Sequence, residues 1–392
     1  MTTIPGPAPT HDPARATRRG LIAGGVAAAA AAVTLAPGCA TAGASGGSSA
    51  GATPAPASMP RRDLGGLSVS QVGMGVQNQH RSFHSIVPNR DDMVRLIREA
   101  HDEGVTFFDC AEVYGPFDCE RILGEAIQGR RDQLQVVTKV GFDVDPVTGE
   151  NRFGRNSRPA SLRRAVEGSL QRLGTDRVDL LYQHRVDPEV PIADVAGLVQ
   201  ELMREGKVLH WGLSEAGPRT VRRAHGLLPL SALQYEYSPL FRGREADIIP
   251  LAEELGVGFV AFAPLGYGFL TGAVDADTQF VPSDFRSNTS RMDEANRAHN
   301  LELVRVMRRF AERSGATPAQ VAVAWVLGQG PSVVPIPGTT QFSHMRQNAH
   351  PARLSPSEFA ELDAAVRAVQ VRGERAPALV QEWNMTEAPD AA

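Results

Sequence analysis

The chain has 392 residues, of which 42% are hydrophobic and 21% are charged, and its formal net charge is −4 at pH 7. This composition is typical of a globular protein with a sizeable core, and the weak negative charge disfavours nucleic acid or an anionic membrane as the main partner. The three cysteines, Cys39, Cys110 and Cys119, have no repeated spacing, so neither a disulfide framework nor a zinc site is expected. We expect Cys110 and Cys119 to be small buried side chains beside a strand end.

Residues 1–42 have the pattern of an export signal. Thr17-Arg18-Arg19-Gly20-Leu21-Ile22 precedes an alanine-rich apolar run to Ala36, and Ala40-Thr41-Ala42 is typical of a cleavage site. The paired arginines resemble a twin-arginine signal peptide, so we expect a periplasmic or secreted protein that is exported already folded. A cytoplasmic extension is the alternative, and lipidation of Cys39 stays open. The apolar run is too short and too weakly hydrophobic to predict stable membrane insertion.

Residues 43–60 are rich in Gly, Ser, Ala and Pro and predict a flexible linker, after which apolar runs alternate with helix-like segments. Leu64–Val69 and Gln71–Val76 predict a short hairpin that continues into a first strand. The elements predicted after it, in chain order, are helix Asp91–Glu103, strand Val105–Phe108, helix Cys119–Ile127, strand Leu134–Val137, helix Ser161–Leu173, strand Val178–Tyr182, helix Ile192–Glu205, strand Val208–Leu213, helix Arg219–His225, strand Ala232–Tyr235, helix Asp247–Leu255, strand Gly258–Ala263, helices Leu301–Arg313 and Pro318–Leu327, and strand Ser332–Ile336.

This regular alternation predicts an α/β fold, a (β/α)8 TIM barrel with an N-terminal β-hairpin, over residues 61–392. A doubly wound dinucleotide-binding sheet is the competitor. Its glycine-rich turn would have to follow a strand and open a helix, whereas Gly256-Val257-Gly258-Phe259-Val260-Ala261 lies before and inside a strand. Two long loops, Gly141–Arg158 and Gly266–Asn296, are expected to be lids or binding walls. A closing helix is expected from Ser355 to Val369.

Four reactive side chains lie at or near the C-terminal ends of the predicted strands: Asp109, Tyr114, Lys139 and His184. The ends of several strands supply the catalytic groups of such barrels. A lysine ammonium beside a phenol favours the phenolate and lowers the phenol pKa, and an aspartate keeps that lysine charged. With a histidine to polarise the same oxygen, these groups can protonate a carbonyl oxygen while hydride is delivered to its carbon.

These residues also carry a family resemblance. Phe108-Asp109-Cys110-Ala111-Glu112-Val113-Tyr114-Gly115, Thr138-Lys139 and Asp179-Leu180-Leu181-Tyr182-Gln183-His184 resemble the three catalytic signatures of the aldo-keto reductase family, in matching order. The resemblance covers roughly Arg61 to Leu354. It implies NADP(H)-dependent reduction of aldehydes or ketones, with Tyr114 as general acid/base, Lys139 tuning it, Asp109 pairing with Lys139, and His184 positioning the carbonyl. Cys110 departs from the threonine or serine common in the family.

The resemblance also implies how a nicotinamide dinucleotide would bind. Ser214, Glu215 and Gln234 match the carboxamide-binding positions, where an amide needs both donors and acceptors. A helix N-terminus after the last strand matches the site of the adenosine phosphate. NADPH is favoured and NADH is the alternative, since His344 stands where many relatives carry arginine or lysine, and Tyr267 stands where relatives carry arginine. The remaining expected cofactor-binding residues are Phe262, Pro264, Leu265, Gly266, Gly338, Thr339, Thr340, His344, Gln347 and Asn348.

Two functions other than carbonyl reduction are compatible with a barrel of this kind: a regulatory module and a metal-dependent hydrolase. The same fold serves as the cofactor-sensing β subunit of potassium channels, so a regulatory or binding module is the alternative to an enzyme. A metal-dependent hydrolase is disfavoured because no His-x-His or clustered carboxylates close a strand, and no metal site is expected. The sequence leaves open the physiological carbonyl substrate, the oligomeric state, how cofactor would be recycled outside the cytoplasm, and whether Trp383, in a C-terminal extension from about residue 371, packs across the active-site mouth.

Overall fold

The computed structural model describes residues 59–81 and 86–390. The predicted signal peptide, Cys39 and nearly all of the predicted linker lie outside the described residues. The chain described begins with an antiparallel hairpin of β1 (Arg61–Leu64) and β2 (Leu67–Ser70). Its turn is Gly65-Gly66, with φ of 58° and 94°, a backbone conformation that glycine adopts without strain. The expected pairing of Leu64–Val69 with Gln71–Val76 is therefore wrong, because the glycines reverse the chain four residues earlier than Ser70.

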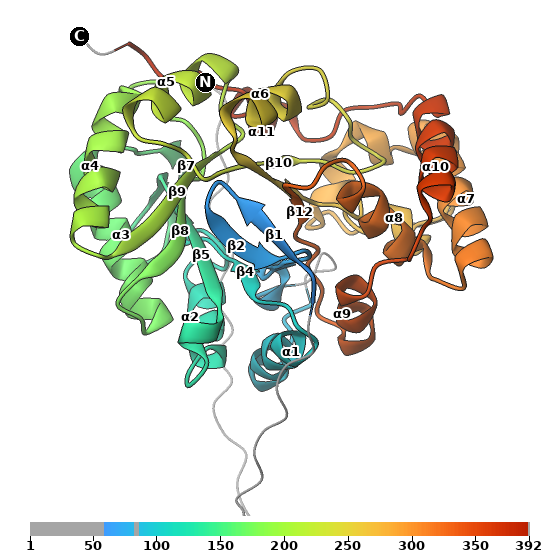
Figure 1. Cartoon of the computed structure of the whole chain (residues 1–392), viewed down its shortest axis with the longest axis horizontal. Coiled ribbons are helices and arrows are strands. Elements are labelled where there is room, and N and C mark those ends of the chain that lie inside the picture. The colour runs from blue at the N-terminus through green and yellow to red at the C-terminus, as the bar shows by residue number, and fades with distance from the viewer. Residues whose placement is uncertain (1–58, 82–85, 391–392) are drawn as a thin grey trace, which may run out of the picture. The chain divides into compact units, whose positions relative to one another are not determined.

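Eight parallel strands follow and form a barrel, as the alternation of strands and helices predicts (Figure 1). Neighbouring strands pair in the order β3-β4-β5-β8-β9-β10-β11-β12. Backbone hydrogen bonds from Gly73 N to Pro335 O (3.0 Å) and from Gly75 N to Pro337 O (3.3 Å) join the first strand to the last. The strands are β3 (Met74–Gly75), β4 (Phe107–Asp109), β5 (Gln135–Val140), β8 (Val178–Gln183), β9 (Val208–Ser214), β10 (Ala232–Glu236), β11 (Gly258–Phe262) and β12 (Val333–Pro335).

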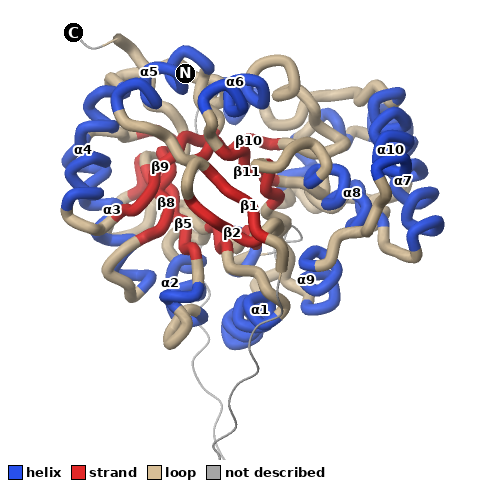
Figure 2. The backbone as a smooth tube through the Cα atoms, viewed as in Figure 1, coloured by secondary structure: helices blue, strands red, loops and turns tan. Residues whose placement is uncertain are grey.

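Helices surround the strands (Figure 2). They are α1 (Arg90–Asp102), α2 (Asp118–Ala126), α3 (Pro159–Leu173), α4 (Ile192–Arg204), α5 (Pro218–Leu227), α6 (Ile248–Leu255), α7 (Glu294–Ser314), α8 (Pro318–Leu327), α9 (Phe342–Ala349), α10 (Pro356–Ala368) and α11 (Ala378–Glu382). The loop expected at Gly141–Arg158 contains a second hairpin, of β6 (Phe142–Val144) and β7 (Asn151–Arg155). The loop expected at Gly266–Asn296 contains short 3-10 turns, and α7 begins at Glu294 rather than Leu301.

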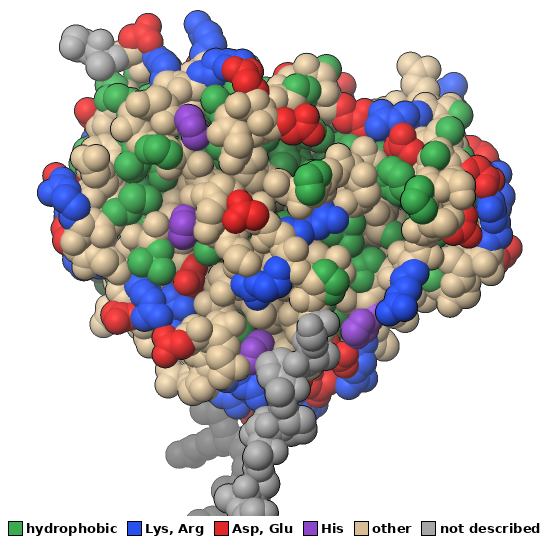
Figure 3. Space-filling model, viewed as in Figure 1, with side chains coloured by type: hydrophobic (Ala, Val, Ile, Leu, Met, Phe, Trp, Pro, Cys, Tyr) green, Lys and Arg blue, Asp and Glu red, His purple; other side chains and the backbone are tan. Residues whose placement is uncertain are grey.

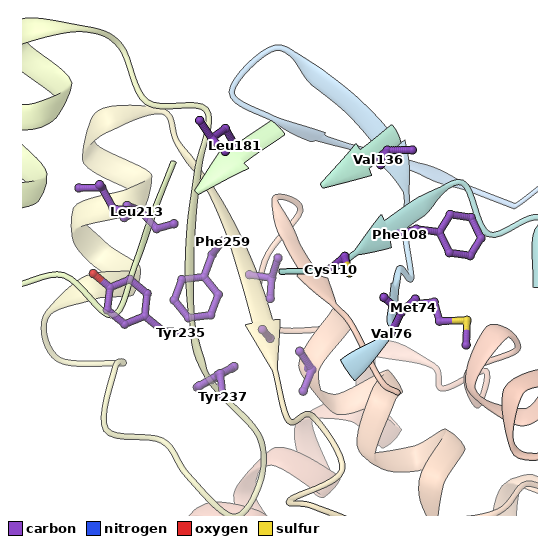
Figure 4. Close-up of a cluster of buried hydrophobic side chains, with 14 of the residues drawn as sticks. Met74, Val76, Phe108, Cys110, Val136, Leu181, Leu213, Tyr235, Tyr237 and Phe259 are labelled. Carbon is purple, nitrogen blue, oxygen red and sulfur yellow. The ribbon is translucent and has the colours of Figure 1, made fainter. Parts of the chain in front are cut away.

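Two apolar cores result from the two-residue period of the strands. Side chains that point outward, such as Leu181, Leu213 and Phe259, pack in the large core between strands and helices (Figure 4). Side chains that point inward form a smaller core, in which Leu64, Leu67 and Val69 of the hairpin cluster with residues of the barrel interior. The hairpin therefore closes the N-terminal end of the barrel.

The face covered by this hairpin carries acidic and basic side chains interspersed (Figure 3). Within residues 59–81 and 86–390, no helix is long and apolar enough to cross a bilayer. Cys110 and Cys119 are both buried and unpaired, as expected for small core side chains.

Candidate active site

The inner face of the barrel changes from apolar to polar along each strand. Phe107 and Val137 belong to the inner core, and the next inward residues on the same strands are Asp109 and Lys139. On β9 and β10, Ser214 and Gln234 occupy paired positions at the same end of the barrel. The C-terminal ends of the strands therefore bring together polar side chains that lie far apart in the sequence.

Lys139 is at the centre of this group. Its side chain is fully buried and forms an ion pair with the Oδ1 atom of Asp109. The ammonium also donates to Cys110 O (2.9 Å) and to the Tyr114 hydroxyl oxygen (3.3 Å). Asp109 is held in turn by the side-chain amide of Gln234, which donates to Oδ2 at 2.8 Å. The predicted contacts of Lys139 with Asp109 and Tyr114 are both present.

The loop that carries Tyr114 is fixed to the neighbouring strand. Glu112 N donates to Lys139 O at 3.1 Å, and Cys119 N, at the start of α2, donates to Tyr114 O at 3.2 Å. Gly115 has a φ of 101°, and a Cβ atom there would lie 2.9 Å from the ring of His80. The sharp turn after Tyr114 therefore requires glycine, and it sets the direction of the phenol toward Lys139.

Burial and the charge of Lys139 act in opposite directions on the pKa of Tyr114. Burial raises the pKa of the phenol above its ordinary value, and the Lys139 ammonium lowers it by a smaller amount. The lysine thus acts in the expected sense, but desolvation is larger, so the phenol is protonated at neutral pH. Burial by itself lowers the pKa of Lys139, but Asp109 and Tyr114 more than compensate and the net shift is upward. Lys139 is therefore a cation.

His184 directly follows β8 and is held by aromatic rings. Its ring centroid lies 5.6 Å from that of Tyr114 and 4.7 Å from that of Phe142, both with edge-to-face geometry. Burial, together with the positive charges of Arg185 and Lys139, keeps the pKa of His184 well below its ordinary value. The imidazole is therefore neutral, and it can hydrogen-bond a carbonyl oxygen without adding a charge.

Trp383, directly after α11, packs on this wall, with its ring centroid 5.6 Å from that of Phe142. The C-terminal extension, whose position the sequence left open, therefore reaches the side chains next to His184. We call residues 371–390 the C-terminal tail. Its Met385 N donates to Glu215 O at 2.7 Å and its Thr386 O accepts from Gly217 N at 2.9 Å, so the tail is bonded to the segment after β9.

The expected carboxamide-binding residues are only partly free for a ligand. Ser214 and Gln234 lie on the inner face beside Asp109, and their hydroxyl and amide groups fit the donors and acceptors of a carboxamide. Glu215 has a φ of 52° and points its buried carboxylate at Arg375 of the tail (2.5 Å) instead. Phe262 is half-buried at the end of β11, and the expected stretch Pro264, Leu265 and Gly266 follows it in a turn.

The expected phosphate-binding residues lie around the start of α9. Gly338, Thr339 and Thr340 are half-buried in the segment before the helix, and Gln347 and Asn348 lie in its last turn. His344 is exposed on the first turns, whereas the nearby Arg346 is paired with Glu99 (2.8 Å) of α1. Backbone amides and hydroxyls at a helix N-terminus suit an anion.

Four further charged residues at this end of the barrel were not singled out from the sequence. They are Arg185, Glu236, Arg291 and Arg375. Arg375 donates to Glu215 Oε1 and to Glu236 Oε2, both at 3.0 Å, and Arg291 donates to Glu236 Oε1 at 2.7 Å. No local pattern marks these contacts, which join residues up to 160 positions apart. In the part of the chain that the structure describes, no group of His, Cys, Asp and Glu could hold a metal ion.

Comparison with known proteins gives a consistent result. Residues 73–367 match the model of the aldo/keto reductase family. The chain is 36% identical over 328 residues to aldo-keto reductase str7 of Strobilurus tenacellus, covering 81% of this chain and 95% of that one. It is similar in structure to a glycerol dehydrogenase of Gluconobacter oxydans, with 29% identity, a TM-score of 0.71, and coverage of 80% and 96%. An aldo/keto reductase of Klebsiella pneumoniae in complex with NADP and acetate matches with 26% identity, a TM-score of 0.60, and coverage of 80% and 97%.

Proposed function

Because the chain belongs to the aldo/keto reductase family of oxidoreductases, we propose that it reduces an aldehyde or ketone to an alcohol with NADPH, using Tyr114 as the proton donor. The observation that supports this most directly is the position of the Lys139 ammonium, which contacts both Asp109 and the Tyr114 hydroxyl at the interior rim of the barrel. A buried cation beside a phenol is suited to proton transfer at one point in space.

The chain's own residues act on the carbonyl oxygen. A reduced nicotinamide dinucleotide, when bound, would supply the hydride for the carbonyl carbon. The phenol of Tyr114, protonated at neutral pH, gives its proton to the oxygen, and Lys139 stabilises the phenolate that is left. Neutral His184 donates a hydrogen bond to the same oxygen and fixes its position. Asp109 keeps Lys139 charged and directed at the phenol.

The residues that would hold the cofactor are Ser214 and Gln234 at the nicotinamide end, and Gly338 to Thr340 with the first turn of α9 at the phosphate end. That the similar Klebsiella pneumoniae protein binds NADP supports a preference for NADPH. His344 in place of a stronger cation leaves NADH as the second choice, because a neutral imidazole attracts an extra phosphate weakly. We also propose that residues 1–42 direct export.

Replacing the Tyr114 hydroxyl tests the proposal. Tyr114→Phe should lower kcat for aldehyde reduction by about 10²- to 10⁴-fold, the usual contribution of a positioned acid, while NADPH binding measured by fluorescence changes little. Tyr237→Phe is a matched control, because the buried Tyr237 hydroxyl donates to Glu245 (2.8 Å), away from Lys139. A Tyr114→Phe enzyme with wild-type turnover would exclude the proposed role. Many turnovers per minute by the wild type would argue against a purely regulatory module.

A further inference from the structure

Arg185, the residue directly after His184, forms no ion pair with an acidic side chain among the residues that the structure describes. Its Nη1 atom donates to His184 O (2.6 Å) and to the Ser214 hydroxyl (3.1 Å), and both acceptors are neutral. Its Nε atom is buried and has no hydrogen-bond partner in the described part of the chain. The side chain of Arg185 is half-buried, so it combines an unpaired N–H group with access from outside, and a guanidinium in this position is suited to binding an anion.

The acidic residues nearby are already engaged. Both carboxylate oxygens of Glu215 accept from Arg375, and the carboxylate of Glu236 is divided between Arg375 and Arg291. Glu215, Glu236 and Arg291 are at most 1% exposed, and Arg375 is 8% exposed. With Arg185 the group has three guanidinium groups and two carboxylates, which leaves one positive charge without compensation.

Two carboxylates lie close in sequence, and the first of them to be excluded is Glu189, which pairs with Arg158 (3.1 Å). Asp187 also points elsewhere. It is 2% exposed, and its oxygens accept from the backbone amides of Ser157 (2.9 Å) and Glu189 (3.0 Å). These bonds fix the loop after β8. They do not neutralise Arg185.

The guanidinium of Arg185 lies beside the reacting groups. Ser214, which it contacts, is on the inner face next to Gln234, and Gln234 bonds Asp109. The positive charge of Arg185 is close enough to lower the pKa of both Tyr114 and His184. An anion bound by Arg185 would therefore lie next to a carbonyl group held by Tyr114 and His184.

We propose that Arg185 binds a carboxylate of the substrate, so that the preferred substrate is an oxo acid, an aldehyde or ketone that also carries a carboxylate. A guanidinium matches the two oxygens of a carboxylate and forms charge-assisted hydrogen bonds with them. The inference rests on the proposed function, because it concerns the substrate of the same site.

The test compares an anionic aldehyde, 4-formylbenzoate, with its uncharged methyl ester, using NADPH and the full-length protein. The wild type should show a kcat/KM about 10- to 100-fold higher for the acid, the effect of hydrogen bonds to a charged group. Arg185→Gln should bring the ratio of the two kcat/KM values close to one, and Arg185→Lys should keep part of the preference. Arg62→Gln is the control. Within the described residues, Arg62 also donates to neutral acceptors, which are the carbonyls of residues 327, 330 and 333, but it lies at the hairpin end of the barrel. Its ratio should match the wild type.

The outcomes separate this inference from the function on which it depends. Reduction of both aldehydes without preference for the acid would overturn the inference and leave the proposed function intact. An equal loss for both aldehydes in Arg185→Gln, with a raised KM for NADPH, would show that Arg185 serves the cofactor instead, and would also overturn it. Turnover of neither aldehyde would refute both. A wild-type ratio close to one would overturn the inference even if neither variant folds.

Discussion

Arg375 gives the sharpest test of how the C-terminal tail is attached to the barrel. Its guanidinium contacts two buried carboxylates, with donor to acceptor distances of 3.0, 3.0 and 2.5 Å to Glu215 and Glu236. In Arg375→Ala, Glu236 keeps its ion pair with Arg291, but Glu215 loses its cation. The carboxylate of Glu215 is then left with the backbone amide of Glu236 as donor (3.0 Å).

Removing one partner of a buried ion pair typically costs about 3–5 kcal/mol, because the remaining charge stays buried. Arg375→Ala should therefore lower the free energy of unfolding by about 4 kcal/mol, measured by urea denaturation of the full-length protein. In the double variant Arg375→Ala/Glu215→Gln the stranded charge is gone, so a substantial part of that loss should be recovered.

Arg367 is a matched control on α10. It also contacts two carboxylates, Glu245 (2.5 Å) and Asp363 (2.7 Å), but its side chain is 44% exposed. Water screens such a pair, so Arg367→Ala should cost no more than about 1 kcal/mol. Equal losses in Arg367→Ala and Arg375→Ala, or a double variant no more stable than Arg375→Ala, would refute the reasoning from buried charge.

Three further predictions concern the reaction centre and the wall beside it. Because burial raises the pKa of Tyr114, kcat for reduction should stay constant through neutral pH and fall only above about pH 10, where the proton donor is lost. Lys139→Met removes the cation that opposes this rise in the Tyr114 pKa. Alcohol oxidation needs the phenolate, so its kcat should fall by about 10²- to 10⁴-fold and its pH profile should move to higher pH. An unchanged pH profile would contradict the role of Lys139. Trp383→Ala removes the ring beside Phe142 and should raise KM for aromatic aldehydes more than for acetaldehyde, and a uniform change would contradict a wall formed by the tail.

The features that could be predicted from the sequence are those with a local physical signal. Helix α8 spans the predicted range, because Thr317 and Gln320 form a capping box at its start and Gly328 follows its end. Asp109 and Lys139 were found because each lies just beyond a short apolar run that predicts a strand, and the two-residue period of the observed strands places both inside the barrel.

The features that could not be predicted depend on contacts between distant segments. The first turns of α7, residues 294–300, have no apolar periodicity, and they are held by bonds such as Arg297 to Ala276 O (2.7 Å) and Asn300 to Arg372 O (2.9 Å). The β6–β7 hairpin was likewise hidden, because its short strands are exposed or half-buried and show no apolar pattern. The same limit applies to the net shift of the Tyr114 pKa, since the extent of burial depends on the whole fold.

Two segments outside the strand and helix repeat determine the environment of the charged groups. The β1–β2 hairpin closes the N-terminal end of the barrel with Leu64, Leu67 and Val69, and the tail is bonded across the segment after β9 at the other end. Water is thereby kept from the fully buried charges, such as Lys139 and Glu215, and each of these needs a partner within the protein. Lys139 has Asp109 and Arg375 has Glu215, whereas the acceptors of Arg185 are neutral. The described residues supply a counter-charge for Lys139 and none for Arg185, and the proposed carboxylate of the substrate would supply it during each turnover.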